Sequence, residues 1–396
     1  MVGWVKPLIR GEGVSSLNVS IVIPEKLSYG GGGEMFVAEV SKYLKSRKFN
    51  VTIIQKGTNN EFDLDTDNSS NNGVPIITLE YERVTAIGLK FFSQPLPKMA
   101  FFKRFDVNMI MCYRLPAKKS IIEMKKEGIS VVFLFHGITF EEFSIFNLKA
   151  SLFSIYNKVY LKIVGNKYKE FAFKFQVINQ TTKNVLTDSG IEEANVHLPL
   201  LGVNEIPNVQ FVEEDKFIVI VVGRLENLQK GIDRLLKVIK LAEKIYHNNI
   251  EFQVVGKGKD DWHLISGSRR LSNLKFFGYV DRNVKFELLS KASLFLCTSN
   301  IEPFGFALIE ALLMGLPVVS TPVSGPKFIL SKDPLFGKIS TFRTKKLLLD
   351  ISEFHSLWAR DRIRYLQIKK YISLKSKSLF SQDDMLADIE KLVRGA

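Results

Sequence analysis

The stretch NIEPFGFALIEALLMGLPVV, residues 300–319, carries two carboxylates, Glu302 and Glu310, and no other charge. The apolar run at 293–297 before it predicts a strand, and a helix is expected over about 304–314 after a short loop. Gly315 is suited to end that helix and Pro317 prevents it from resuming. A second apolar run, 317–320, predicts the next strand. This succession of strand, helix and strand is typical of a parallel sheet covered by helices.

Glu310 is the unusual residue of this stretch, because its neighbours at every helical spacing are apolar. A buried carboxylate costs several kcal/mol unless it is hydrogen bonded or paired. The hydroxyls of a sugar diol could supply two donors to it. A glutamate that caps backbone amides, or that pairs with a nearby lysine, would also account for the pattern.

Glu302 lies in the loop before the helix and is expected to face the same cleft. The backbone amides of Phe304, Gly305 and Phe306 would be free at the helix N-terminus, where phosphate binds well. Two carboxylates can also perform acid–base chemistry on a glycosidic bond. The spacing of Glu302 and Glu310 alone therefore leaves a glycosidase pair open.

Strand and helix patterns alternate along most of the chain. Near-continuous apolar runs, as expected for strands buried on both faces, occur at 18–23, 51–55, 107–111, 131–135, 217–222, 251–255, 293–297 and 317–320. Amphipathic patterns at 34–45 and 232–246 predict helices between them. The polar, proline-containing segment 201–216 interrupts the alternation and predicts a domain boundary. The expected fold is α/β with two Rossmann-like, doubly wound domains that face a central cleft, the default ligand site.

The predicted domains are residues 1–205, residues 206–375, and a C-terminal segment, 376–396. In that segment Ser381 and Asp384 resemble a capping box that opens a last helix, which is expected to cross back to the first domain.

The composition restricts the class of protein. The 396 residues carry a formal charge of +14, which favours anionic partners such as nucleotides, nucleic acid or an acidic membrane surface. Only two cysteines, Cys112 and Cys297, occur, and both lie in apolar runs, so no disulfide framework is expected. No apolar stretch reaches transmembrane length and the N-terminus lacks a secretory pattern. These features indicate a soluble, cytoplasmic protein.

A second constellation is VVGRLENLQKGIDRLL, residues 221–236. A strand is expected to end at Gly223, and Arg224 and Lys230 follow before the next helix. Arginine chelates two oxygens and lysine supplies a point charge, so two cations at the carboxyl end of a strand suit a diphosphate. In a chain this rich in Lys and Arg, two solvated surface cations are the competing interpretation.

Three further motifs are weaker by themselves. Gly31 and Gly32 belong to four consecutive glycines between a predicted strand and helix, which resembles a phosphate-binding loop without its full fingerprint. His136 directly follows the strand 131–135, at the edge where α/β proteins assemble their sites, although a lone histidine is more often structural. Gly256 and Gly258 also follow a strand, but two glycines are weak support for a dinucleotide site.

Taken in order, these segments resemble glycosyltransferase family 4, the retaining GT-B enzymes that use nucleotide sugars. The resemblance covers about residues 18–330. It rests on GGGGE (30–34), FHG (135–137), LPLLGVN (198–204), GRLENLQKG (223–231), VVGKG (254–258), FFGYV (276–280) and SNIEPFGFALIEALLMGLPVV (299–319). The last of these is similar to the family's E-x7-E motif. One departure is Leu201, where the family usually has Asn.

The resemblance implies a role for each matching residue. Arg224 and Lys230, next to Gly223, would hold the donor diphosphate, Glu310 the ribose hydroxyls, and Glu302 hydroxyls of the transferred sugar. The remaining positions would contact the sugar or the phosphates: His136, Gly31, Gly32, Phe304, Gly305 and Phe306. Neither glutamate would be a covalent nucleophile. No metal and no cofactor are implied, because the two cations replace the metal.

The implied activity is retaining transfer of a hexosyl group from a UDP- or GDP-sugar to a glycan, lipid-linked or other hydroxyl acceptor. UDP-glucose and GDP-mannose fit equally well. A non-catalytic protein that binds a sugar nucleotide or nucleic acid on a GT-B scaffold is the alternative.

Two segments of the first domain, 89–105 and 149–174, are basic and aromatic. Such segments can lie on an anionic membrane, or contact nucleic acid, or form amphipathic helices whose lysines face water. The sequence leaves peripheral membrane contact open and makes nucleic acid the less favoured partner.

Overall fold

The computed structural model describes residues 16–24, 27, 32–57, 73–82, 94–112, 116–136, 151, 152, 155, 156, 158, 159, 161, 173–199, 202, 203, 207 and 215–396. The chain divides into two compact units. The first comprises Met1–Leu134, Glu170–Lys174 and Ile389–Ala396, and the second comprises Phe135–Lys169 and Phe175–Asp388. Gly31, the polar run 58–72 and most of the segment 149–174 lie outside the described residues.

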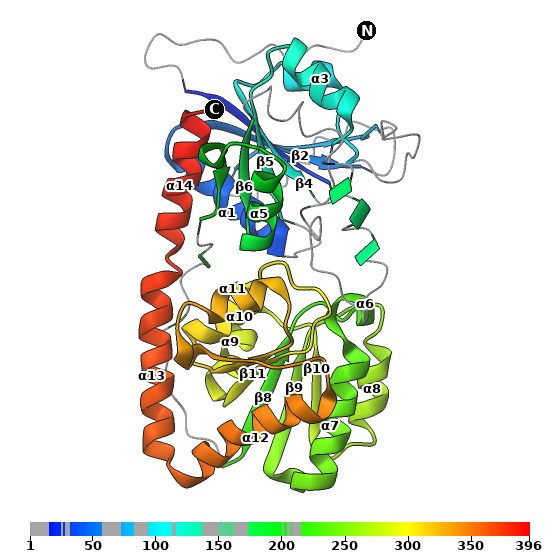
Figure 1. Cartoon of the computed structure of the whole chain (residues 1–396), viewed down its shortest axis with the longest axis vertical. Helices are drawn as coiled ribbons and strands as arrows, with labels where there is room; N and C mark the ends of the chain where they lie inside the picture. Colours follow the sequence, from blue (N-terminus) through cyan, green and yellow to red (C-terminus); the bar gives the residue numbers. More distant parts are fainter. Residues whose placement is uncertain are drawn as a thin grey trace. The chain divides into compact units, whose positions relative to one another are not determined.

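The first sheet has the strand order β3-β2-β1-β4-β5-β6-β7 (Figure 1). Its strands are β1 (Asn18–Ile23), β2 (Asn50–Lys56), β3 (Ile76–Leu79), β4 (Val107–Cys112), β5 (Val131–Phe135), β6 (Lys174–Val177) and β7 (Val196–His197). β1 pairs in parallel with β2 on one side and with β4 on the other. The accompanying helices are α1 (Gly32–Ser46), α2 (Met99–Phe102), α3 (Lys118–Lys126) and α5 (Gln180–Asp188).

The second sheet has the order β10-β9-β8-β11-β12-β13. Its strands are β8 (Phe217–Val222), β9 (Ile250–Val255), β10 (Leu274–Gly278), β11 (Leu294–Cys297), β12 (Val318–Ser320) and β13 (Gly337–Ile339). All of its pairings are parallel. β8 has the next strand along the chain, β9, on one side and β11 on the other, so the order of winding reverses between β8 and β11. Such a reversal is where doubly wound sheets bind their ligands.

The helices of the second sheet are α6 (Asn227–Lys230), α7 (Ile232–Tyr246), α8 (Trp262–Ser268), α9 (Arg282–Lys291), α10 (Phe306–Leu313), α11 (Ser324–Leu330), α12 (Thr344–Arg360) and α13 (Arg362–Leu379). The last helix is α14 (Gln382–Arg394), whose residues from Ile389 onward belong to the first unit. α7 has apolar residues three or four positions apart, among them Leu235, Val238 and Ile239, and they pack on Phe217 and Phe252 of the sheet. α12 adds Leu347 and Ile351 to the same core. This packing covers one face of the sheet at the strands that carry the candidate site.

The eight predicted strands are all present within one or two residues of their predicted bounds. Among the described residues, five other strands were not predicted. β3, β6, β7, β10 and β13 are short, and in β10 only Leu274 is buried, so none forms a long apolar run. The predicted helix over 304–314 begins two residues later, at Phe306, because Gly305 adopts a positive φ of 109° and cannot continue an α-helix. Asp384 donates its amide to the Ser381 hydroxyl at 3.3 Å, which is the N-cap half of the capping box.

No helix among the described residues combines the length and the apolar character needed to cross a bilayer.

Lys369 on α13 provides a pH-dependent term in the stability of the fold. Its side chain is buried and its ammonium donates to the Ala292 carbonyl at 2.8 Å, at the C-terminus of α9. Burial lowers the pKa of Lys369 from 10.5 to about 8. Between these two values the unfolded chain binds more protons than the folded protein, so the free energy of unfolding rises with pH across that window.

We therefore expect Lys369→Met to lose this rise. Relative to the variant, the native protein should gain on the order of 3 kcal/mol of unfolding free energy between about pH 7.5 and 10.5. Urea unfolding at several pH values measures it. Lys370→Met removes the exposed neighbouring lysine and serves as the control. An equal pH dependence in both variants would contradict the assignment.

Candidate functional site

The candidate site is built from two loops at the carboxyl ends of β8 and β11, the adjacent strands between which the winding reverses. The first loop, 223–231, connects β8 to α7 and contains the short helix α6. The second loop, 298–305, connects β11 to α10. Both sequence constellations therefore meet at one edge of one sheet.

Backbone hydrogen bonds hold the two loops together. The amides of Asn300 and Ile301 both donate to the Gln229 carbonyl, at 2.8 and 3.1 Å. The Thr298 hydroxyl donates to the Lys230 carbonyl at 3.0 Å. Because these bonds join main chain to main chain or to a short side chain, the distance between the loops is closely set.

Gly231 makes this close approach feasible. It has a positive φ of 65°, and a Cβ at this position would lie closer than 3.0 Å to the Thr298 carbonyl oxygen. A larger residue would be strained by its backbone conformation and would also push the loops apart.

Arg234 reinforces the same arrangement from the first turn of α7. Its guanidinium donates to the Thr298 carbonyl at 2.6 Å, to Asn300 Oδ1 at 2.8 Å and to the Phe342 carbonyl at 3.1 Å. Burial lowers the pKa of Arg234 to about 10, so it remains charged at neutral pH. The sequence analysis missed this residue, because one arginine among many in an amphipathic helix has no distinguishing spacing.

Gly256 and Gly258 serve the packing of the first loop. A Cβ on Gly256 would clash with the Gly223 carbonyl, and one on Gly258 would clash with the Leu225 backbone. The Leu225 amide also donates to the Lys257 carbonyl at 3.1 Å. Close main-chain approach thus accounts for both glycines without a dinucleotide.

Lys230 and Glu302 form an ion pair between the two loops. Their side chains are only 21% and 15% exposed. Burial by itself lowers the pKa of Lys230, but the charge of Glu302, together with Cys297 and the hydrogen bond that the ammonium donates to Glu302, outweighs it, so the pKa is raised overall. The ammonium is therefore charged at neutral pH.

Arg224 stands next to this pair and is exposed. In the part of the chain that the structure describes, its guanidinium has no hydrogen bond or ion pair. Its positive charge acts on Lys230 and lowers the pKa of that ammonium, against the effect of Glu302. An uncommitted guanidinium beside a second cation is an arrangement that suits an anion with several oxygens.

Glu310 lies on α10 and is buried, as its apolar surroundings predict. Its Oε1 accepts from Lys285 Nζ on α9 at 2.6 Å, and the two side chains are 9% and 18% exposed. The sequence left a sugar diol, backbone amides or a nearby lysine open as partners of this carboxylate, and the structure shows a lysine. Lys285 was not predicted from the sequence. It lies on α9, which carries no recognisable motif, whereas Glu310 lies on α10.

The start of α10 differs from the expected arrangement. The helix begins at Phe306, so the Phe304 amide precedes the helix. The rings of Phe304 and Phe306 meet edge to face at 5.0 Å between centroids. The Gly325 amide donates to the Glu302 carbonyl at 2.8 Å, and a Cβ on Gly325 would collide with the Phe304 carbonyl. Gly325 therefore fixes the backbone that carries Glu302.

His136 follows β5 as expected and is buried. Its Nε2 lies 2.5 Å from Gln176 Oε1, and burial lowers its pKa to about 4. The imidazole is therefore neutral at physiological pH, and Nε2 must carry the proton to donate to the amide oxygen. Gly32 is the first residue of α1, whereas Gly31 lies outside the described residues.

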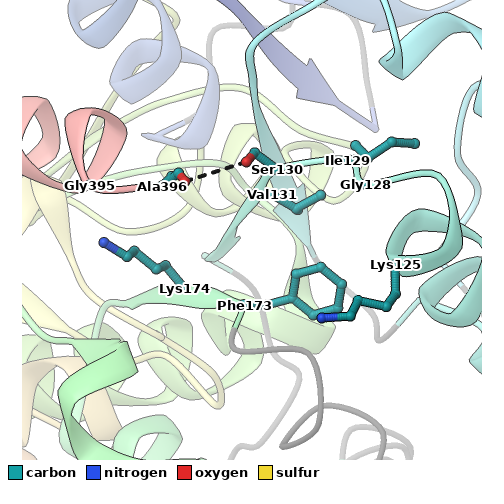
Figure 2. A pocket seen from close by; sticks show the side chains of 9 residues that line it. All are labelled: Lys125, Gly128, Ile129, Ser130, Val131, Phe173, Lys174, Gly395 and Ala396. Atoms are coloured by element: carbon teal, nitrogen blue, oxygen red, sulfur yellow. Dashed lines mark hydrogen bonds between the residues drawn. The ribbon is translucent and has the colours of Figure 1, made fainter.

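A pocket of about 270 Å³ lies elsewhere, in the first unit (Figure 2). It is lined by Lys125, Gly128, Ile129, Ser130, Val131, Phe173, Lys174, Gly395 and Ala396. Val131 begins β5 and Lys174 begins β6. The pocket therefore lies at the amino ends of these strands, the edge opposite to that at which parallel sheets bind ligands.

Comparison with known proteins agrees with the geometry. Residues 203–333, which contain both loops, match the family model for glycosyl transferases group 1. Over 157 residues the chain is 32% identical to the 2-deoxystreptamine N-acetyl-D-glucosaminyltransferase of Niallia circulans, which covers 36% of this chain and 39% of that enzyme. The chain spans about two fifths or less of the length of the curated relatives it matches.

Solved structures resemble the chain over nearly its whole length. Sucrose-phosphate synthase from Thermosynechococcus elongatus has a TM-score of 0.70 at 15% identity, with 96% of this chain and 98% of that chain covered. HepE of Anabaena, in complex with UDP and glucose, has a TM-score of 0.66 at 16% identity and coverage of 96% and 100%. The fold is GT-B, with two Rossmann-like domains, which confirms the predicted fold class.

Proposed function

We propose that this protein is a retaining glycosyltransferase that transfers a hexosyl group from a nucleotide-diphosphate sugar to a hydroxyl acceptor without a metal ion. One observation carries the proposal: the Arg224 guanidinium, which has no side-chain partner among the described residues, stands beside the Lys230–Glu302 pair, at the point where the second sheet reverses its winding. The match of residues 203–333 to glycosyl transferases group 1 supports the same reaction class.

The diphosphate of the donor would bind to the two cations. As the bond from the anomeric carbon to the phosphate oxygen breaks, negative charge grows on the departing diphosphate. Arg224 can chelate two of its oxygens, and Lys230 adds a second charge. Because both cations are supplied by the chain, metal-independent transfer is the simplest proposal.

Lys230 and Glu302 are paired before the donor arrives. A bound diphosphate would compete for the ammonium, and the Glu302 carboxylate could then accept hydroxyls of the transferred sugar. Glu310 would accept a ribose hydroxyl while Lys285 holds its Oε1. Donor binding would thereby replace one set of charge-assisted hydrogen bonds with another.

A glycosidase pair fits less well. That chemistry needs one of two carboxyls in its protonated form as a general acid. Here Glu302 and Glu310 are each engaged in an ion pair with a lysine. The arrangement is suited to binding hydroxyls and to positioning, which supply much of the rate enhancement when a good leaving group is already present.

HepE, the structural neighbour solved with UDP and glucose, makes a uridine nucleotide a natural first donor to test. The acceptor is proposed to be a glycan or lipid-linked hydroxyl compound at the cytoplasmic side, with the first domain providing its site. The basic, aromatic segments 89–105 and 149–174 remain the segments at which we predict contact with a membrane.

Calorimetric titration with UDP, GDP and ADP in the absence of metal tests the proposal. We expect one nucleotide to bind, and Glu310→Gln to weaken it by about tenfold or more, because a hydrogen bond to a charged group contributes about 1.5–3 kcal/mol. The glutamine keeps the volume of the side chain and an oxygen that can accept from Lys285. Lys244→Gln on the surface of α7 serves as the control.

The binding alternative predicts a different combination of results. Nucleotide binding without release of the nucleotide from any sugar conjugate, with or without added acceptor, would favour a non-catalytic scaffold. No binding of any of the three nucleotides would overturn the assignment of the site.

A further inference from the structure

Helix α13 has an unusual charge composition. Over its 18 residues, RIRYLQIKKYISLKSKSL, every charged side chain is Lys or Arg and none is Asp or Glu. α7 is of similar length and also carries exposed lysines, but it contains two acidic residues as well, Asp233 and Glu243. The positive charge of α13 is therefore not balanced along its own length.

One side of α13 is committed to the fold. Tyr365, Ile372 and Ser376 are buried there, and Lys369 is turned inward with them. The Tyr365 hydroxyl donates to the Ser293 carbonyl at 2.9 Å, and the Ser373 hydroxyl donates to the Leu313 carbonyl at 2.7 Å. These contacts fix which side of the helix remains accessible.

The opposite side, which we call the α13 face, consists of Ile363, Arg364, Gln367, Lys370, Leu374 and Lys377, all exposed. Ile363 and Leu374 are 73% and 70% exposed and lie eleven positions, about three turns, apart on the same stripe. Arg364, Lys370 and Lys377 have no ion pair or side-chain hydrogen bond within the described residues. Tyr371 lies on the same side and is 42% exposed, and its hydroxyl donates to Asp333 Oδ2 at 2.7 Å.

We propose that the α13 face docks on the surface of an anionic lipid bilayer. Helices that lie in the membrane interface combine exposed aliphatic side chains with lysine and arginine, and the face has both. Each cation close to an anionic surface strengthens binding by about fivefold. Duplex nucleic acid would be bound through its phosphates, a contact in which exposed aliphatic side chains such as Ile363 and Leu374 have no part.

This inference does not depend on the proposed sugar chemistry. It adds a contact in the second unit to the basic segments that the sequence analysis placed in the first domain. Figure 1 shows α13 as the long orange helix at the edge of the second unit, where α10 and α12 pack against it.

Co-sedimentation of the full chain with vesicles tests the proposal. The probes are phosphatidylcholine vesicles with and without phosphatidylglycerol, at low and high salt. We expect binding only with phosphatidylglycerol, weakened by salt. Lys370→Glu/Lys377→Glu and, separately, Ile363→Ser/Leu374→Ser should each weaken it by more than about tenfold.

The controls come from α7, where Lys237→Glu/Lys240→Glu and Ile245→Ser make the same kinds of change at exposed positions. They should bind as the native protein does, and thermal melts verify that every variant folds. Three results would overturn the proposal: no binding to phosphatidylglycerol vesicles, equal losses in the α7 and α13 variants, or loss of duplex DNA binding in the α13 variants without any vesicle binding.

Discussion

Replacing Lys230 with alanine is expected to lower the rate of sugar transfer by about 100- to 1,000-fold, the effect of removing one pre-positioned donor to a developing negative charge. The substitution removes the ammonium that would meet the diphosphate. It also leaves Glu302 without its lysine in a position where the carboxylate is only 15% exposed. Both effects act on the same step, so the loss should appear mainly in kcat rather than in KM.

The measurement is release of nucleotide diphosphate from the sugar donor identified by the binding screen, with the acceptor present. Lys237→Ala removes an exposed lysine from α7 and should retain full activity. Lys230→Ala/Glu302→Ala should lose more activity than Lys230→Ala alone, because the contact of Glu302 with the sugar hydroxyls is removed as well. Transfer at the native rate by Lys230→Ala would exclude Lys230 from the reaction.

Gly231→Ala is expected to be strongly destabilising. Gly231 and Gly278 have nearly the same positive φ, 65° and 68°, but a Cβ on Gly278 meets nothing within 4 Å, whereas one on Gly231 collides with the Thr298 carbonyl. Gly278→Ala should therefore cost about 1–2 kcal/mol of unfolding free energy, the cost of a left-handed alanine. Gly231→Ala should cost about 1–3 kcal/mol more, because the packing must also yield.

Urea unfolding of the two variants isolates the collision, since the backbone term is common to both. Gly231→Ala should in addition weaken nucleotide binding, because it separates the loop of Lys230 from the loop of Glu302. Equal unfolding free energies for the two variants would show that the loops move apart at no cost and that their spacing is not set by Gly231.

Much of the fold was predictable because it depends on local patterns. The apolar positions of 232–246 recur every three or four residues, and the helix α7 has those bounds. Strands such as β5 and β8 are largely buried on both faces, so each forms a continuous apolar run. Short strands such as β6 and β13 depend on pairing with a neighbour already in place, and three or four residues do not make a pattern.

The site was predicted as a set of residues but not as a set of contacts. Arg224, Lys230, Glu302 and Glu310 stand out because charged residues in apolar or glycine-rich surroundings need a reason. The partners of these side chains could not be predicted from the sequence. The pairing of Lys230 with Glu302, and of Glu310 with Lys285, joins residues far apart in the chain that become neighbours only after the strands are ordered.

The sequence by itself thus determined the class of fold, the position of the loops after β8 and β11, and the buried carboxylate on α10. Those features follow from periodicity, turn residues and the cost of burying a charge, all of which act over a few residues. Only the tertiary structure decided that Lys285 pairs with Glu310, that Arg234 is bound to the loop of Asn300, and that Arg224 has no side-chain partner in the described part of the chain. An ion pair or hydrogen bond requires atoms within about 3 Å of each other, and sheet packing, rather than the local pattern of residues, brings such side chains that close.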